Sequence, residues 1–328
     1  MLKLSICIIA YNEENFLPRL LEDIKSQEYP HEYTEVVLID GMSQDKTKAI
    51  MEAFKAEDNG FYNVRVLDNP KRIQAAGWNV AVDNFTGDVL SRIDAHTHIP
   101  SDFSRKVMAD IEQGENVVGV KRPCLVESDS KWAKMLLSTE NALFGSSINS
   151  SRRSETKTYI NTMFHASYRR EVFEKVGHFN EKLIRTEDNE MHYRIREAGY
   201  KLLYDPEIVS YQYARSSLKR MIKQKFGNGY WIGQTVKVCP RCLSLYHFVP
   251  LAFVLAIIVT SVIAVFGFPW LSLIMWGLYG LFAFVSMIIA MINDGFSFAM
   301  LLMPAIFPVL HVSYGIGTLC GLLHFKRL

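Results

Sequence analysis

The chain has 328 residues, which is enough for one sizeable domain and a further appendage. Its 36 Lys and Arg residues nearly balance its 34 Asp and Glu residues. Such a balance argues against a nucleic-acid-binding protein, because these proteins usually carry a strongly basic domain. We therefore expect no nucleic-acid partner.

Charged residues are distributed unevenly along the chain. They are dense between Lys3 and Arg241, whereas from Cys242 to Phe325 the one acidic or basic residue, histidines aside, is Asp294. This composition predicts a soluble, globular first part and a lipid-embedded second part, divided near residue 240.

Apolar runs of strand length alternate with segments of helical period over the first 94 residues. The pattern predicts strands over 4–10, 35–40, 64–67 and 88–93, and helices over 14–26, 46–57 and 72–84. This alternation is typical of an α/β domain with a parallel, doubly wound sheet. Ligands of such sheets bind beyond the carboxyl ends of the strands, so the residues that follow each strand are the first candidates for a site.

Beyond residue 100 the pattern is mixed. It predicts strands over 117–120 and 201–204, and helices over 131–144, 169–176 and 187–198. The polar stretch 146–154 is predicted to be a mobile loop that faces the site. We expect the catalytic domain to occupy residues 1–213.

Residues 214–244 form a basic, amphipathic segment in front of the apolar region. Its cations include Arg215, Lys219 and Lys223, and they interleave with apolar side chains. This composition predicts an interfacial helix that binds anionic membrane lipids, with a solvated charged face as the alternative.

Three apolar stretches follow, over 246–267, 269–292 and 296–323. Each is close to the ~20 residues that a helix needs to cross a bilayer. We therefore expect residues 245–328 to be a membrane domain with about three transmembrane helices, in a multi-pass protein of the plasma membrane.

The expected orientation contains a conflict. The apolar run at residues 4–9 is too short for a signal peptide, so the N-terminal domain is expected in the cytoplasm. Three crossings would then place Lys326 and Arg327 outside, against the positive-inside tendency. Either the tail is an exception, or one segment re-enters the membrane near Pro304 and Pro308.

Three groups of residues could carry chemistry. Asp94 and His96 follow the fourth strand, and a carboxylate with an imidazole can bind a divalent cation and leave positions for diphosphate oxygens. Glu187 and Asp188 could cap a helix, or could include a general base for an acceptor hydroxyl. Asp40 could accept a hydrogen bond from a nucleobase, or could be an ordinary turn residue. None of these groups identifies an enzyme by itself.

Taken together and in order, the motifs of this chain carry a resemblance. They are Ser-Ile-Cys-Ile-Ile-Ala-Tyr-Asn-Glu-Glu at 5–14, Val-Leu-Ile-Asp-Gly-Met-Ser-Gln-Asp-Lys-Thr at 37–47, Ala-Ala-Gly-Trp-Asn at 75–79, Ile-Asp-Ala-His at 93–96, Tyr-Arg-Arg-Glu-Val-Phe-Glu-Lys-Val-Gly-His-Phe-Asn-Glu at 168–181, and Glu187-Asp188. Over residues 4–210 the chain resembles family-2 inverting glycosyltransferases with the glycosyltransferase-A fold. It looks closest to bacterial exopolysaccharide enzymes of the succinoglycan glucosyltransferase type.

The resemblance assigns roles to residues of this chain. It implies Asp188 as the catalytic base with Glu187 beside it, and Asp94 and His96 as the residues that hold the metal and the donor diphosphate. It implies a nucleotide-sugar site and an acceptor side, whose residues are Ala10, Tyr11, Glu13, Asp40, Lys71, Arg72 and Gln74 for the donor and Phe164 and His165 for the acceptor. Asp40 would contact the base, which is expected to be uracil.

Two departures from the family pattern narrow this expectation. The usual Asp-Asp pair after the second strand is Asp40-Gly41 here, which leaves one carboxylate for the nucleoside. The Gln-x-x-Arg-Trp motif of processive synthases is absent, and the segment 223–231 does not match it. This absence argues against a polymerising synthase.

The resemblance therefore implies a metal-dependent hexosyltransferase. It would move a sugar from a nucleotide-sugar, expected to be a UDP-hexose, to a polyprenyl-diphosphate-linked saccharide in polysaccharide biosynthesis. The expected cofactor is Mn²⁺ or Mg²⁺, and an imidazole ligand predicts that Mn²⁺ supports activity at least as well as Mg²⁺. The alternatives are a polyprenyl-phosphate sugar synthase and a non-catalytic, nucleotide-binding membrane scaffold.

Overall fold

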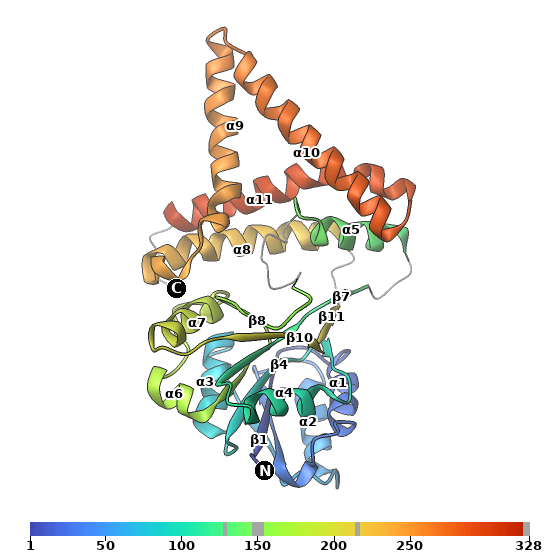
Figure 1. Cartoon of the computed structure of the whole chain (residues 1–328), viewed down its shortest axis with the longest axis vertical. Helices are drawn as coiled ribbons and strands as arrows, with labels where there is room; N and C mark the ends of the chain where they lie inside the picture. The colour runs from blue at the N-terminus through green and yellow to red at the C-terminus, as the bar shows by residue number, and fades with distance from the viewer. Residues whose placement is uncertain (127–129, 146–153, 214–216, 324–328) are drawn as a thin grey trace. The chain divides into compact units, whose positions relative to one another are not determined.

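The computed structural model describes residues 1–126, 130–145, 154–213 and 217–323 (Figure 1). The chain forms two compact units, one of Met1–Pro123 and Ser151–Tyr213 and the other of Cys124–Ser150 and Ala214–Leu328. The last of these divisions along the chain falls between Tyr213 and Ala214. Residues 124–150, however, which we expected in the catalytic domain, group with the apolar C-terminal helices.

The first unit is built on one large sheet. Its strand order in the described residues is β3-β2-β1-β4-β9-β6-β10-β8. The bounds are Leu4–Ala10 for β1, Thr34–Asp40 for β2, Asn63–Asp68 for β3, Val89–Asp94 for β4, Val117–Lys121 for β6, Thr158–Tyr159 for β8, Ser167–Arg169 for β9 and Leu203–Val209 for β10. A separate short pairing joins β5 (Thr97–His98) to β11 (Tyr211–Tyr213).

Most of the large sheet is parallel, as the sequence predicts. Strands β3, β2, β1 and β4 run parallel to one another, and so do β6 and β10. Strand β9 lies between β4 and β6 and runs antiparallel to both. The prediction missed β9 because a strand of three residues is too short to show a hydrophobic period.

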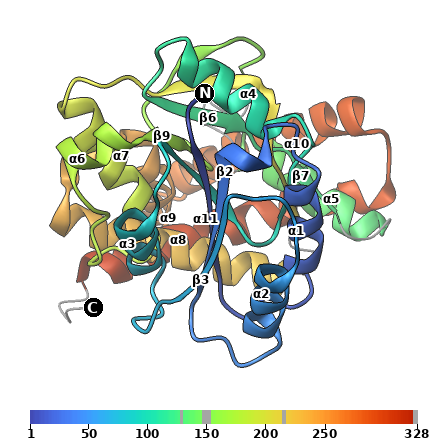
Figure 2. The ribbon, with the colours of Figure 1, turned by 90° about the horizontal axis from the view of Figure 1, so that it is seen from below.

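Helices cover both faces of the sheet (Figure 2). The first face carries α1 (Leu17–Lys25), α2 (Thr47–Ala56) and α4 (Phe103–Glu112). The second face carries α3 (Gln74–Asn84), α6 (Arg170–Val176) and α7 (Glu187–Glu197). A short 3₁₀ helix, η1 (His31–Tyr33), precedes β2.

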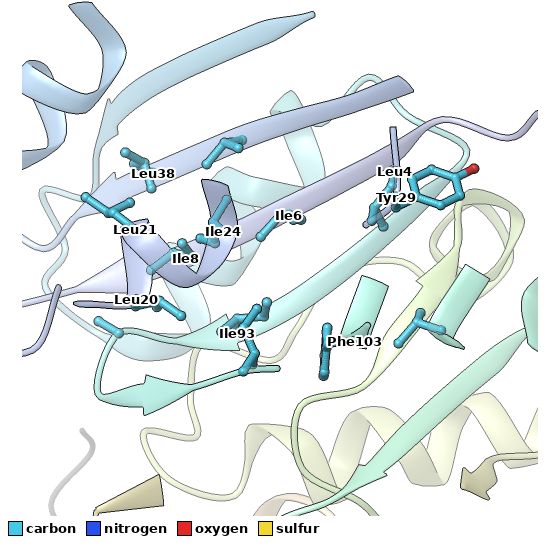
Figure 3. Close-up of a cluster of buried hydrophobic side chains, with 14 of the residues drawn as sticks. Leu4, Ile6, Ile8, Leu20, Leu21, Ile24, Tyr29, Leu38, Ile93 and Phe103 are labelled. Atoms are coloured by element: carbon cyan, nitrogen blue, oxygen red, sulfur yellow. The ribbon is translucent and has the colours of Figure 1, made fainter. Parts of the chain in front are cut away.

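Alternate residues of β1 supply the two cores. Ile6 and Ile8 point into the cluster beneath α1, where they meet Leu20 and Ile24 (Figure 3). Cys7 belongs to the opposite cluster, and all these side chains are fully buried. A strand that is apolar on both faces must be covered on both sides, which is why the sequence reads as one continuous apolar run.

Several helix ends differ from the predicted ones. α1 begins at Leu17 rather than residue 14, because Asn12 does not cap it; Asn12 has a φ of +56° and bonds to the loop after β2. α3 begins at Gln74 rather than residue 72, since Arg72 has a φ of +57° in the turn before it. Such backbone angles lie outside the helical region.

Among the described residues of the second unit, the short strand β7 (Cys124–Leu125) accompanies a set of helices. Its helices are α5 (Lys131–Asn141), α8 (Leu218–Val238), η3 (Pro240–Cys242), η4 (Leu245–Phe248), α9 (Val249–Val265), α10 (Trp270–Asp294), η5 (Phe298–Leu302) and α11 (Met303–Leu323). In the part of the chain that the structure describes, three segments are long and apolar enough to cross a membrane: Leu245–Val265, Trp270–Asp294 and Phe298–Leu323. The predicted loop at 146–154 lies outside the described residues except for Ser154.

Candidate active site

The parallel strands bring their carboxyl ends to one edge of the sheet. Ala10 is paired with Asp40, and Ile9 with Asp94. The loops that follow β1 and β2 are bonded to each other. The Asn12 N–H donates to Ser43 Oγ at 3.0 Å, and the Glu13 N–H donates to Thr47 Oγ1 at 2.7 Å. The predicted donor-binding residues Tyr11 and Glu13 therefore lie on a loop that is hydrogen-bonded to the loop after Asp40.

Asp40 and Tyr11 occupy the part of this edge predicted to hold the nucleoside. Asp40 is buried, and both of its carboxylate oxygens lie 3.2 Å from the Ser43 N–H. Tyr11 is 49% exposed, so its ring is available to a ligand. A Cβ at Gly41 would lie 3.1 Å from Tyr11 Cβ and 3.2 Å from the Ala10 carbonyl oxygen. This close approach gives a local reason for glycine where the family usually has a second aspartate.

Lys71 and Arg72 lie on the turn from β3 to α3, and Gln74 is the first residue of α3. The Lys71 ammonium is 2.6 Å from the Glu181 carboxylate, and this contact lowers the pKa of Glu181. Both side chains are partly exposed, so the ion pair can open at small cost. Contact of these three residues with the donor diphosphate stays a prediction.

Asp94 ends β4 and is surrounded by cationic and polar partners. Its Oδ2 lies 3.0 Å from His165 Nε2 and 3.4 Å from Arg122 Nη2. Burial raises the pKa of Asp94, but His165, Arg122 and Arg92 outweigh it and hold the pKa well below its usual range. Because burial lowers the pKa of His165 to about 4, this ring is neutral at pH 7. The two arginines therefore supply the positive charge that keeps Asp94 ionised.

Of the two residues predicted on the acceptor side, His165 contacts this carboxylate and Phe164 contacts its partner Arg122. His165 is buried and has a φ of +44°, and its Nδ1 lies 2.8 Å from Ser210 Oγ. The Phe164 ring lies 4.9 Å from the Arg122 guanidinium. The structure thus places Phe164 and His165 next to the partners of Asp94, and their contact with an acceptor remains a prediction.

His96 lies two residues after Asp94, in the turn between β4 and β5. Its Nδ1 is 3.5 Å from Glu13 Oε1, and its Nε2 is 3.0 Å from Gln212 Nε2. Unlike Asp94, it is substantially exposed, with 36% of its side chain accessible. The turn thus brings the predicted metal residue His96 next to the predicted donor residue Glu13.

The side chains of Asp94 and His96 at this turn fit a cation whose remaining ligands come from a substrate and from water. In the described part of the chain, no group of three or more His, Cys, Asp or Glu side chains could hold a metal ion. Asp94 and His96 would therefore act as a two-ligand set. An ionised carboxylate and an accessible imidazole suit Mn²⁺ or Mg²⁺ when diphosphate oxygens and water complete the shell.

Glu187 begins α7 and forms a buried ion pair with Arg92. Its Oε1 lies 3.0 Å from Arg92 Nη2, and both side chains are less than a tenth exposed. The Arg92 guanidinium also lies 4.5 Å from the Trp78 ring and 5.8 Å from the Phe179 ring. Burial raises the pKa of Glu187 to about 7, although Arg92 opposes this shift.

The sequence analysis missed Arg92. The sequence feature that could have revealed it is a charged residue inside the apolar strand Val89–Asp94. A charge buried there without a partner would cost too much free energy. The guanidinium attracts Glu187, Asp94 and Asp188, and these charges raise its pKa despite burial. Arg92 thus stands among the three carboxylates that the resemblance had singled out.

Asp188 lies in the first turn of α7, beside Glu187, and is partly exposed. Its Oδ1 accepts the Asn189 N–H at 2.8 Å. Burial raises the pKa of Asp188, Arg92 opposes the shift, and the negative charge of Asp94 adds to it. A carboxylate with a raised pKa that remains accessible has the properties of a general base.

A second buried network supports α7. The Tyr168 hydroxyl lies 2.8 Å from His192 Nε2, and Thr162 Oγ1 lies 2.8 Å from Asn189 Oδ1 and 3.4 Å from His192 Nδ1. Burial lowers the pKa of His192 to about 3, so the ring is neutral and can accept the tyrosine hydrogen bond. This network links the start of α7 to β9.

These features define the class of protein. A mostly parallel sheet with helices on both faces, which gathers carboxylates from β4 and α7, is the architecture of glycosyltransferase-A enzymes. The sequence model described as glycosyl transferase family 2 matches residues 5–177. The chain therefore belongs to glycosyl transferase family 2 and is a glycosyltransferase.

Two curated relatives and one solved structure illustrate the similarity. A dolichyl N-acetyl-α-D-glucosaminyl phosphate 3-β-D-2,3-diacetamido-2,3-dideoxy-β-D-glucuronosyltransferase of Methanococcus voltae is 29% identical over 269 residues, with 79% of this chain and 82% of that protein covered. The succinoglycan biosynthesis protein ExoA of Rhizobium meliloti is 31% identical over 227 residues, with 68% and 67% covered. The mannosyltransferase PcManGT of Pyrobaculum calidifontis, solved with GDP-Man and Mn²⁺, aligns with a TM-score of 0.60 at 16% identity, covering 99% of this chain and 88% of that one. This last likeness shows the fold.

Proposed function

We propose that this glycosyltransferase moves a hexose, with inversion, from a UDP-sugar to a saccharide carried on a polyprenyl phosphate or diphosphate. The observation that carries the proposal is the convergence of Asp94, Glu187 and Asp188 on Arg92 at the end of β4. The named acceptor of the Methanococcus voltae relative, a dolichyl phosphate sugar, supports the choice of a lipid-linked saccharide.

The donor is held at the carboxyl ends of β1, β2 and β4. Asp40 accepts a hydrogen bond from the base, and Tyr11 lies against the nucleoside. Asp94 and His96 would hold a divalent cation together with the donor diphosphate, and such a cation would supply positive charge beside the leaving group. The low pKa of Asp94 keeps this ligand ionised at neutral pH.

Asp188 acts on the acceptor. Its carboxylate removes the proton from the acceptor hydroxyl as the oxygen bonds to the anomeric carbon and the bond to the diphosphate breaks. The proton remains on Asp188 and the electron pair leaves with the nucleoside diphosphate. Attack opposite the leaving group converts an α-linked donor into a β-linked product.

Arg92 and Glu187 position the two acting carboxylates. Arg92 lies on β4, two residues before Asp94, and its partner Glu187 directly precedes Asp188 on α7. The ion pair therefore ties the donor side of the site to the acceptor side. Because both members are buried, the connection is shielded from solvent.

The experiment compares Asp188→Asn with Glu197→Gln in the full chain. Glu197 lies on the same helix and is exposed, so its substitution is a matched control for loss of a carboxylate. Nucleotide release is measured with UDP- and GDP-hexoses and a polyprenyl-diphosphate-linked disaccharide. We expect Asp188→Asn to lower kcat about 10²–10⁴-fold while Glu197→Gln stays near normal.

The outcomes separate the candidate reactions. Near-normal transfer by Asp188→Asn to a hydroxyl acceptor would show that Asp188 is not the base. If transfer occurs only to polyprenyl phosphate, whose anionic oxygen needs no strong base, the protein is a polyprenyl-phosphate sugar synthase. No binding or turnover across the donor panel would support a non-catalytic scaffold.

The cation is tested by binding as well as by activity. Paramagnetic resonance of Mn²⁺ is followed as protein is added in the presence of UDP, for the wild type and for Asp94→Asn and His96→Gln. We expect both variants to weaken Mn²⁺ binding at least tenfold, since each variant removes one of the two metal ligands that the protein contributes. Unchanged binding in His96→Gln would show that His96 only shapes the pocket.

A further inference from the structure

The three apolar segments of the second unit differ in how much of their surface is covered. Of α9, whose residues are all described, Val254 alone is buried, and three residues of α10 are. α11 buries eight, which are Met303, Ile306, Phe307, Leu310, Gly315, Gly317, Thr318 and Gly321. Within this unit, α9 and α10 rise as a hairpin from the layer that α8 and α11 form (Figure 1).

Glycines hold α11 against α8 at backbone contact. A Cβ at Gly317 would lie 2.2 Å from the Phe226 carbonyl oxygen, and one at Gly321 would lie 2.1 Å from the Tyr230 carbonyl oxygen. On α8, a Cβ at Gly229 would likewise lie 2.0 Å from the Tyr314 carbonyl oxygen. Each of these distances is too short for any side chain, so the pairing depends on the glycines.

The contacts show that α8 and α11 run parallel. Phe226 lies at Gly317 and Tyr230 at Gly321, so both helices advance in the same direction. The first turns of α8, which carry the exposed cations Lys219, Arg220 and Lys223, therefore lie beside the middle of α11. α11 cannot cross the hydrocarbon core unless these charges enter it too, and such charges are costly there.

Both ends of the α9–α10 hairpin lie at this same layer. At the start of α9, the Pro250 carbonyl oxygen would be 2.3 Å from a Cβ on Gly315 of α11. At the end of α10, Asp294 accepts a hydrogen bond from Ser138 of α5 at 2.5 Å. α5 in turn is joined to α8 by the ion pair between the partly buried Glu140 and the buried Lys225, at 3.2 Å.

We infer that α9 and α10 are the segments that cross the bilayer, and that α11 lies in the membrane interface beside α8. Two crossings return the chain to its starting side, so α5, α8 and α11 share one face of the membrane. The conflict between three crossings and the positions of Lys326 and Arg327 then disappears. This inference does not depend on the proposed activity.

Helix lengths agree with this arrangement. The segment Leu245–Val265 has 21 residues, which at about 1.5 Å each span the ~30 Å of hydrocarbon. α10 has 25 residues and is long enough to cross with a tilt. Figure 1 shows α10 inclined to α9.

The experiment maps the two ends of the full chain in sealed membrane vesicles. An epitope is placed before residue 1 and another after residue 328, with a third construction that carries it in the turn between Gly267 and Phe268. We expect the two terminal epitopes to be cleaved by added protease from the same side, and the turn epitope to be protected under that condition. Terminal epitopes on opposite sides would overturn the inference.

A depth measurement separates an interfacial α11 from a re-entrant one. A keto amino acid coupled to a nitroxide, which leaves the native cysteines in place, is introduced at Ile316 of α11 or at Phe284 of α10. Both positions are exposed. We expect Phe284 to be deep, with high accessibility to oxygen, and Ile316 to be shallow, with high accessibility to a water-soluble nickel complex. An Ile316 label as deep as the Phe284 label would overturn the inference.

Discussion

The buried ion pair between Arg92 and Glu187 offers a sharp test of the site. Replacing Arg92 with Met keeps most of the side-chain volume but leaves Glu187 buried without its cation. An unpaired buried carboxylate costs about 3–5 kcal/mol, unless it takes up a proton. Glu187 is ready to do so, because burial already raises its pKa to about 7 in the wild type.

Proton uptake sets a ceiling on the cost, and this ceiling depends on pH. In the wild type, Glu187 with a pKa of about 7 is already about half protonated at pH 7, so full protonation in the variant costs at most about 0.4 kcal/mol there. Each pH unit above 7 adds about 1.4 kcal/mol, and the ceiling is therefore about 2 kcal/mol at pH 8.5. The sign follows from an acid whose folded pKa rises further in the variant: the wild type releases the proton first, so the penalty of the substitution grows as the pH rises above 7.

Thermal unfolding of the detergent-solubilised full chain measures this penalty. For a unit of this size, Arg92→Met should lower the Tm of the catalytic unit by about 4–8 °C at pH 8.5 and by about 1–2 °C at pH 7. The double variant Arg92→Met, Glu187→Met should recover most of the loss, because an apolar pair of similar volume leaves no buried charge. An equal loss at both pH values, with no recovery in the double variant, would refute this reasoning.

Three further predictions concern stability and donor binding. His192 is neutral in the folded protein, with its pKa lowered to about 3, so below pH 6.5 the unfolded state binds the proton first. The wild type should therefore lose about 2 kcal/mol between pH 7 and pH 5 that His192→Gln does not lose, measured as the difference in Tm. Gly317→Val should cost about 1–3 kcal/mol by forcing α8 and α11 apart, whereas Gly277→Val in α10, with no atom within 4 Å, should leave the Tm nearly unchanged. Asp40→Asn should raise the KM for the UDP-sugar about tenfold with little change in kcat, since contact with the base is equal in the ground and transition states; an unchanged KM would remove Asp40 from the donor site.

The local pattern of apolar and polar residues was enough to predict the main strands and helices of the catalytic unit. Strands β1, β2 and β4 are continuous apolar runs because helices cover both faces of the sheet, and their predicted bounds agree with the structure within one residue. The residues after these strands could be chosen as site candidates because parallel strands end at one edge. The order of the motifs then identified the family, which the match over residues 5–177 confirms.

The partners of the site residues could not be predicted in this way. His165 reaches Asp94, and Arg92 reaches Glu187, across 71 and 95 positions of the chain respectively. Such contacts depend on how β9 is inserted between β4 and β6 and on where α7 starts. Neither feature produces a hydrophobic period in the sequence. β9 has three residues, and the charged residues at the start of α7 are also typical of an ordinary helix cap.

For the membrane segments too, some properties follow from the sequence and others only from the tertiary structure. Apolar length and composition by themselves determined that three helices could cross a bilayer, because the cost of leaving apolar surface in water is a sum over residues. Whether α11 does so depends on its neighbours, since Gly317 and Gly321 bind it to the charged helix α8. Hydropathy is a local property of the chain, whereas the pairing of two helices about 90 residues apart exists only in the tertiary structure.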